Sequence, residues 1–163
     1  MSAKHNFSAR QIMDANIRGI QRGLNIVFDE LQTDIRKRLN QPGTGSGYVG
    51  GQKGQGLFRR RSAPGQPPAV DTGILRNSVQ TDSKKISGTG MVSVVMAGLV
   101  AGVHKDARIP RWLEYGTPNG RMKPRPFIAP SLAAIRPNVA KTIGDQMQIA
   151  IKRMQNQAMR DAK

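Results

Sequence analysis

The sequence predicts an α+β fold with a long N-terminal helix, a small antiparallel sheet of three to four strands, and a C-terminal helix packed on that sheet. Apolar residues recur every three or four positions near both ends of the chain, as they do on one face of a helix. The middle of the chain holds short alternating segments that glycines separate. The 163 residues suffice for one modest core, so we expect a single domain spanning residues 1–163.

The first predicted helix runs from Ser8 to about Leu39. Ser8 can cap this helix and Gln11 can complete a capping box, while Phe7 can pack against Ile12. An apolar stripe follows along the helix: Met13, Ile17, Ile20, Leu24, Val27, Leu31 and Ile35. We expect this stripe to pack on the protein's own sheet or to form a seam against a neighbouring subunit.

Two glycines interrupt the same helix. Gly19 and Gly23 each cost about 1 kcal/mol relative to alanine. Such a cost is offset where another backbone comes close, or the glycines mark a bend. The sequence leaves both explanations open.

Residues 41–68 are rich in glycine and proline and are predicted to form a flexible loop without secondary structure of its own. Its basic residues are candidates for contact with DNA or with an acidic partner: Lys53, Arg59, Arg60 and Arg61. The loop is either an arm that orders on such contact or a solvated segment. Gly45–Gly50 matches GxGxxG, but it follows a helix and runs into more glycine, so we assign no nucleotide site.

The strand candidates are residues 78–86, 91–97 and 99–104, and the glycines between them favour an antiparallel meander. A second long helix is predicted from Phe127, bent or restarted at Pro137. Its apolar face consists of Val139, Ile143, Met147, Ile151, Met154 and Ala158.

The segment before this second helix favours structure over chemistry. Arg111–Tyr115 predicts one helical turn, and Gly116 follows where a helix end favours a left-handed residue. Pro124 and Pro126 then force extended backbone up to the next helix.

Glu114 is an isolated acid in this basic neighbourhood. It is expected either to pair with an arginine or to be an exposed surface acid. The candidate partners are Arg76, Arg111 and Arg125.

Three short motifs occur in order along the chain: Thr72–Val79 (Thr-Gly-Ile-Leu-Arg-Asn-Ser-Val), Leu113–Thr117 (Leu-Glu-Tyr-Gly-Thr) and Pro124–Pro130 (Pro-Arg-Pro-Phe-Ile-Ala-Pro). Together they resemble the neck or tail-completion proteins of long-tailed bacteriophages, which sit between the DNA-filled head and the tail. The sequence departs from that family at 104–108, where members more often carry a Tyr-Ala pair, and in its long loop at 41–67.

The resemblance implies a structural virion protein, assembled in the bacterial cytoplasm, that forms a ring in the head–tail connector, tail-completion or tail-terminator region. A closed head-to-tail contact selects a cyclic order, and a hexamer is the order we expect. Its partners would be head-closure and tail-tube or terminator proteins, and double-stranded DNA passing through the ring. The residues that would brace the fold and the subunit contacts are Thr72, Gly73, Leu75, Arg76, Ser78, Glu114, Tyr115, Gly116, Thr117, Pro124, Arg125, Pro126, Phe127 and Pro130. By the same resemblance, Glu114 would hold the motifs together.

Groups needed for catalysis are not clustered in the sequence. It contains no cysteine, and its two histidines, His5 and His104, lack carboxylates at metal-ligand spacing. No GxSxG elbow or P-loop occurs. We therefore expect no enzyme, no cofactor and no metal site.

The charge balance is strongly basic, with 26 Lys and Arg against 10 Asp and Glu and a formal net charge of +16. Such a charge attracts nucleic acid or meets an acidic neighbouring subunit. Aromatic residues make up 4% of the chain, which favours phosphate contact over base stacking. The alternative function is a sequence-nonspecific basic nucleic-acid-binding protein.

No apolar run approaches the roughly 20 residues that span a bilayer, so no membrane contact is expected.

Overall fold

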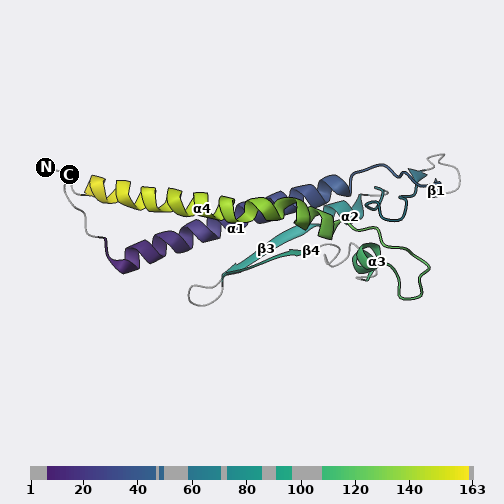
Figure 1. Cartoon of the computed structure of the whole chain (residues 1–163), viewed down its shortest axis with the longest axis horizontal. Coiled ribbons are helices and arrows are strands. Elements are labelled where there is room, and N and C mark those ends of the chain that lie inside the picture. The colour runs from purple at the N-terminus through teal and green to yellow at the C-terminus, as the bar shows by residue number, and fades with distance from the viewer. Residues whose placement is uncertain are drawn as a thin grey trace. The chain divides into compact units, whose positions relative to one another are not determined.

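The computed structural model describes residues 7–46, 48–49, 59–70, 73–85, 91–96 and 108–161 (Figure 1). The helices are α1 (Ala9–Arg38), α2 (Ile74–Asn77), α3 (Ile109–Tyr115) and α4 (Ile128–Asp161). The strands are β1 (Tyr48–Val49), β2 (Arg59–Arg60), β3 (Gln80–Lys85) and β4 (Met91–Met96). Helix therefore predominates in the part of the chain that is described.

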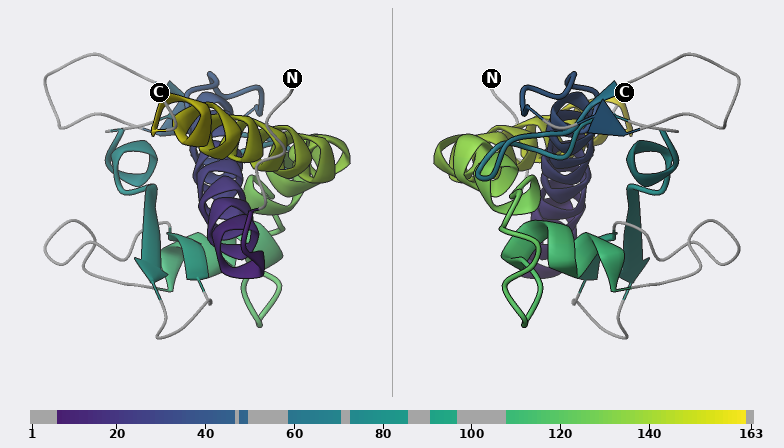
Figure 2. Two further views of the ribbon diagram at one scale, coloured as in Figure 1. Left: turned by 90° about the vertical axis from the view of Figure 1, so that its left-hand side faces the viewer. Right: turned by 90° about the vertical axis from the view of Figure 1, so that its right-hand side faces the viewer.

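The predicted sheet of three to four strands, with the C-terminal helix packed on it, is wrong. In the described residues β1 pairs only with β2, and β3 only with β4; the second pair is seen from two further sides in Figure 2. The β1–β2 pair is antiparallel, with Tyr48 opposite Arg60. A two-stranded pair is too narrow to form the layer that an α+β sandwich requires. The third strand candidate, 99–104, lies outside the described residues.

The predicted start of the first helix is confirmed, together with its capping box. The backbone N–H of Ser8 donates to Gln11 Oε1 at 2.9 Å, and the backbone N–H of Gln11 donates to Ser8 Oγ at 3.2 Å. This reciprocal pair satisfies backbone donors that the first turn of a helix leaves open. Local spacing alone was enough to predict it.

The second long helix continues through Pro137, so the prediction that it restarts there is wrong. Proline removes one backbone donor, but the turns on both sides keep their helical conformation over 34 residues. Among the described residues, no helix combines the length and apolarity needed to cross a membrane.

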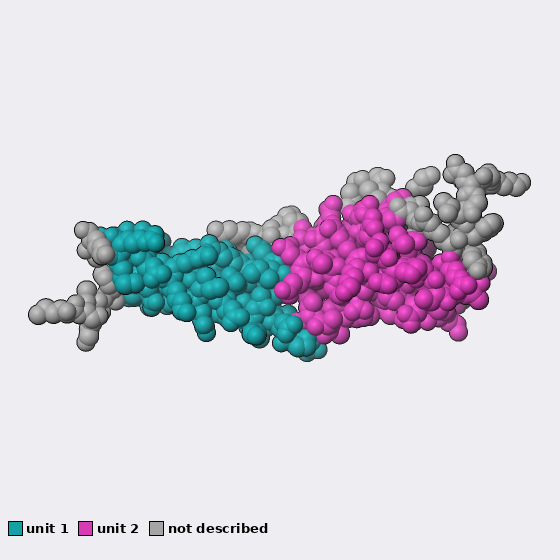
Figure 3. All heavy atoms as spheres, turned by 90° about the horizontal axis from the view of Figure 1, so that it is seen from above, with its two compact units in different colours: residues 1–28, 83–93, 136–163 teal, residues 29–82, 94–135 magenta. Residues whose placement is uncertain are grey.

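The chain divides into two compact units, which Figure 3 shows in different colours. Unit 1 comprises residues 1–28, 83–93 and 136–163, and unit 2 comprises residues 29–82 and 94–135. Each unit takes part of α1 and part of α4, so neither is a continuous stretch of chain. The single domain remains a prediction.

In unit 1, the first part of α1 packs directly against the second part of α4 (Figure 1). A β-carbon on Gly19 would lie 2.5 Å from the Met147 Cα, and one on Gly23 would lie 2.7 Å from the Ile143 Cα. These distances are shorter than any side chain permits, so close approach of another backbone explains both glycines. Met147 and Ile143 belong to the apolar face predicted for the second helix.

The buried line of α1 in unit 1 shares only Val27 with the predicted apolar stripe. It follows Ala15, Gly19, Gly23 and Val27, because small residues let the α4 backbone come near. The predicted stripe residues Met13 and Ile20 remain 51% and 37% exposed. Packing of this part of the stripe on the protein's own sheet is therefore wrong.

Unit 2 holds the larger buried side chains. Its apolar core consists of Leu31, Ile35, Leu39, Val79 and Phe127. Four polar residues are buried in the same unit: Ser62, Ser78, Glu114 and Ser131. Here the predicted stripe is buried at Leu31 and Ile35, and Ser78, Glu114 and Ser131 lie in or next to the sequence motifs.

Candidate functional site

The centre of the motif region is the carboxylate of Glu114, which is only 5% exposed. Its Oε2 accepts hydrogen bonds from the backbone N–H groups of Phe127 at 2.9 Å and Ile128 at 3.0 Å. Its Oε1 accepts a third from the N–H of Ala129 at 2.8 Å. We call this arrangement the Glu114 cap.

The Glu114 cap satisfies the open end of α4. The first N–H groups of a helix lack partners within the helix, and the helix dipole favours a negative charge beside them. One side chain of the second motif thus holds the start of the helix that the third motif enters. The role of this carboxylate is structural, because the three hydrogen bonds that it accepts from described residues all come from backbone amides.

Both residue-based predictions for Glu114 are wrong. The carboxylate is buried, and the one salt bridge among the described residues joins Arg38 to Asp34 instead. A capping box has a sequence signature because its two residues are three positions apart. Glu114 caps amides 13 to 15 positions away, so no local pattern could reveal the contact.

Gly116 ends α3 as the sequence predicts. Its φ is +83°, and its N–H donates to the Trp112 carbonyl at 2.8 Å. A β-carbon there would also lie 2.8 Å from the Met122 carbonyl oxygen. Thr117 closes the turn that follows, because its hydroxyl accepts from the Met122 N–H at 2.9 Å. Glycine is required here by backbone conformation and by space together.

The third motif makes further backbone contacts within unit 2. The Arg125 N–H donates to the Leu113 carbonyl at 2.6 Å, and its guanidinium Nε donates to the Ser62 carbonyl at 3.2 Å. The Pro124 carbonyl accepts from the Gly65 N–H at 2.9 Å. Arg125 thus contacts backbone carbonyls in these bonds, and does not pair with Glu114.

The first motif surrounds the short helix α2. Gly73 precedes it with a φ of +75°, and the buried Ser78 hydroxyl donates to the Leu75 carbonyl at 2.7 Å. Arg76 Nη1 donates to Asn40 Oδ1 at 2.7 Å. The motif's first residue, at position 72, lies outside the described residues.

Val79 connects this motif to α1. Its side chain is fully buried, and its carbonyl accepts from Gln32 Nε2 at 2.9 Å and from Arg36 Nη2 at 2.8 Å. Two long polar side chains of α1 therefore hold the backbone just before β3. Sequence reasoning missed Gln32 and Arg36, since contacts between distant positions leave no local spacing signal.

A small cavity of about 290 Å³ adjoins both the first and the second motif. The residues that line it are Leu39, Pro68, Ala69, Val70, Gly73, Ile74, Leu75, Arg76, Ile109 and Leu113. The first two motifs therefore share one cavity, and the Glu114 cap joins the second to the third. The three motifs form one region of unit 2, which we call the motif region.

Two predicted motif residues lie at the edge of the motif region. Tyr115 is 75% exposed, whereas Phe127 is fully buried. Pro130 is half-buried in the first turn of α4. Tyr115 therefore does not brace the interior of this unit.

The glycine-rich loop has more structure than predicted. Its strands β1 and β2 pair, and the Gly45 N–H donates to the Arg61 carbonyl at 2.7 Å. Arg60 and Arg61 are exposed. Lys53 lies outside the described residues, as do positions 47 and 50 of the GxGxxG match.

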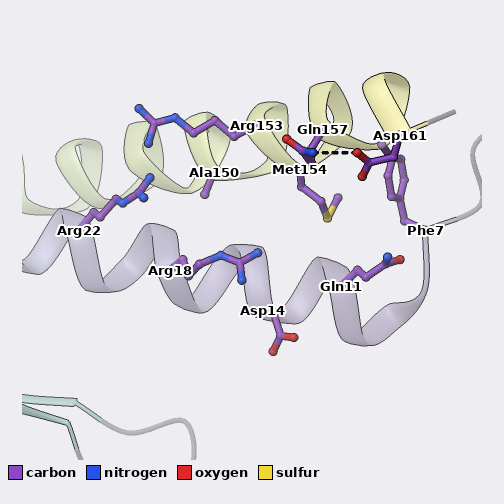
Figure 4. Close-up of a pocket in the computed structure, with 11 residues that line it drawn as sticks. Phe7, Gln11, Asp14, Arg18, Arg22, Ala150, Arg153, Met154, Gln157 and Asp161 are labelled. Carbon is purple, nitrogen blue, oxygen red and sulfur yellow. Dashed lines mark hydrogen bonds between the residues drawn. The ribbon is translucent and has the colours of Figure 1, made fainter. Parts of the chain in front are cut away.

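A second candidate site is a groove of about 410 Å³ in unit 1, between α1 and α4 (Figure 4). Its apolar side is formed by Phe7, Ala150, Met154 and Ala158, and its charged residues are Asp14, Arg18, Arg22, Arg153 and Asp161. Gln157 Nε2 donates to Asp161 Oδ1 at 2.9 Å. None of the three arginines forms a salt bridge within the described part of the chain. We call this the helix-pair groove.

Across the described ranges, no set of three or more His, Cys, Asp or Glu side chains is placed to hold a metal ion. His5 and His104 lie outside those ranges.

Comparison with known proteins adds no further information. No protein-family model matches the chain, and no curated protein or solved structure matches it.

Proposed function

We propose that this protein is a non-enzymatic structural subunit of a bacteriophage neck, which assembles as a ring around the DNA channel between head-closure and tail proteins. The observation that carries the proposal is the Glu114 cap. It uses the acid of one motif to orient the helix that the next motif enters. Glu114 of the second motif therefore fixes the orientation of a helix and does not take part in a reaction. Such a structural role is expected of a subunit that is repeated in an assembly.

Exposed apolar side chains in unit 1 support subunit contact. Those on α1 are Ile12, Met13 and Ile20, and those on α4 are Ile149 and Met159. Met13, Ile17, Ile20 and Leu24 follow the four-three-four spacing of a helix seam. Burying such a seam against another subunit would contribute about 25 cal/mol per Å² of apolar surface.

A second candidate, sequence-nonspecific nucleic-acid binding, is favoured by a different observation. The chain carries a net charge of +16, and the helix-pair groove presents three arginines without salt-bridge partners among the described residues. Phosphate contacts of this kind weaken steeply with salt. A neck subunit would also contact DNA, so DNA binding alone does not separate the two functions.

The deciding experiment is the assembly state of the nuclease-treated protein at high salt, by analytical ultracentrifugation and negative-stain microscopy. Closed rings without nucleic acid are expected for a neck subunit. A species that enlarges only when duplex DNA is added would contradict the proposal and favour the alternative.

A matched variant tests the subunit seam. Met13→Ser with Ile20→Ser should reduce ring formation at least tenfold while leaving the helical circular dichroism intact, because both side chains are exposed. Leu132→Ser is the control, since Leu132 is as exposed as Met13 but lies outside unit 1. Equal loss in both variants would contradict a seam on α1.

A further inference from the structure

The outward side of α3 concentrates aromatic and basic side chains. Arg108, Arg111, Trp112 and Tyr115 line one hollow of about 640 Å³, together with the backbone turn at 116–118. Their spacing of three, four and seven places them on one face of a helix. We call this surface the α3 face. It holds the only tryptophan of the chain and one of its two tyrosines.

The opposite side of α3 is buried, so the α3 face is presented in a defined orientation. Pro110 and Glu114 point into unit 2 and are buried, and Glu114 forms the cap on α4. Gly116 closes the helix end through its bond to the Trp112 carbonyl. A surface ordered before binding loses less conformational entropy when a partner docks.

The exposed side chain of Tyr115 contributes little to the packing of unit 2. Three-quarters of its surface is open to solvent, although its neighbours on both sides are tightly held. Tyrosine, tryptophan and arginine are the residue types that contribute most to binding at protein interfaces. Their grouping on one exposed face of a chain with so few aromatic residues indicates an interaction surface.

The chemistry of the hollow favours an acidic partner. Among the described residues that line it there is no carboxylate, and its Arg111 is exposed and forms no salt bridge with another described residue. Guanidinium groups and the indole N–H donate hydrogen bonds and cannot accept them. A ligand that fits this surface must therefore supply acceptors and negative charge.

The arrangement of the aromatic rings on the α3 face favours a polypeptide ligand over nucleic acid. The Arg108 guanidinium lies 4.9 Å from the centre of the Trp112 ring, which occupies one face of a half-buried indole. Strand binding without sequence preference uses several open rings for successive bases, whereas the α3 face offers one largely open ring, Tyr115. Duplex DNA would make no use of that ring, because its bases are already stacked.

We propose that the α3 face binds an acidic polypeptide segment of another protein, with a carboxylate on Arg111 and an apolar side chain against Tyr115. This goes beyond the ring proposal and does not depend on it. A second copy of this chain is a poor occupant, because it has only 10 acidic residues against 26 basic ones.

The first test is selection of peptides from a random displayed library on the full-length protein, with removal of those that also bind Tyr115→Ser. Peptides that depend on Tyr115 should contain several Asp or Glu residues around an apolar one. If no peptide depends on Tyr115, or if the dependent peptides show no excess of acidic residues, the proposal is wrong.

The second test measures the affinity of the best synthetic peptide through the fluorescence of Trp112, which has no other tryptophan to obscure it. Tyr115→Ser and Arg111→Glu should each weaken binding about tenfold or more. Arg136→Glu makes the same charge change at an exposed position of α4 and should alter affinity less than about twofold. Equal effects of the two charge reversals would overturn the proposal.

Nucleic acid is tested in the same assay with a duplex oligonucleotide and with oligothymidylate. If either oligonucleotide changes the fluorescence of Trp112, the same change should persist in the Tyr115→Ser variant. If Tyr115→Ser instead abolishes a change that either oligonucleotide produces at lower concentration than the peptide, the α3 face serves nucleic acid and the proposal fails. Circular dichroism of both variants checks folding, which these exposed positions should leave intact.

Discussion

Units 1 and 2 bury different kinds of residue. Unit 2 encloses Ile35, Phe127 and the charged Glu114, and side-chain hydrogen bonds to backbone groups connect its segments. Unit 1 buries small residues, Ala15, Gly19 and Gly23, where two helix backbones approach. The difference indicates that unit 2 is stabilised by large buried side chains and buried hydrogen bonds, whereas larger apolar side chains of unit 1, such as Met13 and Ile20, remain exposed.

The Glu114 cap provides the strongest test of this comparison. Glu114→Ala should lower the free energy of unfolding by about 3 kcal/mol or more, because three backbone donors lose a charged acceptor. Urea unfolding measures the loss. Glu30→Ala, which removes the other glutamate from an exposed position, should stay within about 0.5 kcal/mol. Similar losses would show that the cap is not what stabilises unit 2.

Gly116 should give the next largest effect. Gly116→Ala places a β-carbon against the Met122 carbonyl at a φ of +83°, so we expect a loss of about 2 to 3 kcal/mol. Gly120→Ala is the matched control, with a φ of +68° and no atom within 4 Å. It should cost about 1 kcal/mol, the conformational part alone. Thermal unfolding of both variants compares an enclosed glycine of positive φ with an open one.

The helix contact of unit 1 should be less costly to disturb. Gly19→Ala pushes a β-carbon into the α4 backbone, and the resulting loss of about 1 to 3 kcal/mol is offset by about 1 kcal/mol of helix propensity. Gly144→Ala lies in α4 with nothing within 4 Å and should stabilise by up to about 1 kcal/mol. Urea unfolding followed by circular dichroism gives both values. If both substitutions stabilise, the close helix contact does not exist in solution.

Acid should produce the smallest effect, through Asp34 in unit 2. Burial acts to raise the pKa of this carboxyl, but the hydrogen bond from Arg38 at 2.7 Å and nearby positive charge outweigh it, so the pKa lies below its ordinary value of 3.8. The stabilisation is therefore complete above about pH 4 and disappears as pH falls through the lowered pKa. Asp34→Asn should cost less than about 1 kcal/mol at pH 7, and unfolding curves at pH 7 and pH 3 should show that difference shrinking. A difference that grows toward acid would contradict the sign of the shift.

Sequence reasoning succeeded where the deciding contacts are local. The Ser8–Gln11 capping box and the end of α3 at Gly116 follow from residues a few positions apart. The strand candidates 78–86 and 91–97 overlap β3 and β4, but β3 begins only at Gln80. The close approach at Gly19 and Gly23 was one of two explanations left open. Its partner residues, Ile143 and Met147, were on the predicted apolar face, but their pairing with α1 was not predicted.

Some features could not be predicted because the contacts span long stretches of chain. The sheet was expected from alternation in the middle of the sequence, yet the described strands form only pairs, because alternation does not specify which strands meet. Residue spacing gave no sign of how Glu114 acts, because its amide partners lie 13 to 15 positions further along the chain. That Glu114 would hold the motifs together was expected only from the family resemblance. Tyr115 was predicted to brace the fold together with Glu114. The structure shows that Tyr115 is exposed whereas Glu114 is buried.

The sequence by itself determined the two long helices, the glycine that ends the short one, the strong positive charge and the order of the motifs. Each of these depends on local spacing or on composition. Only the tertiary structure decided that Glu114 caps α4, that glycines and not the large apolar residues form the helix contact, and that Tyr115 faces solvent. Those outcomes depend on which distant surfaces meet, and a linear pattern does not specify that.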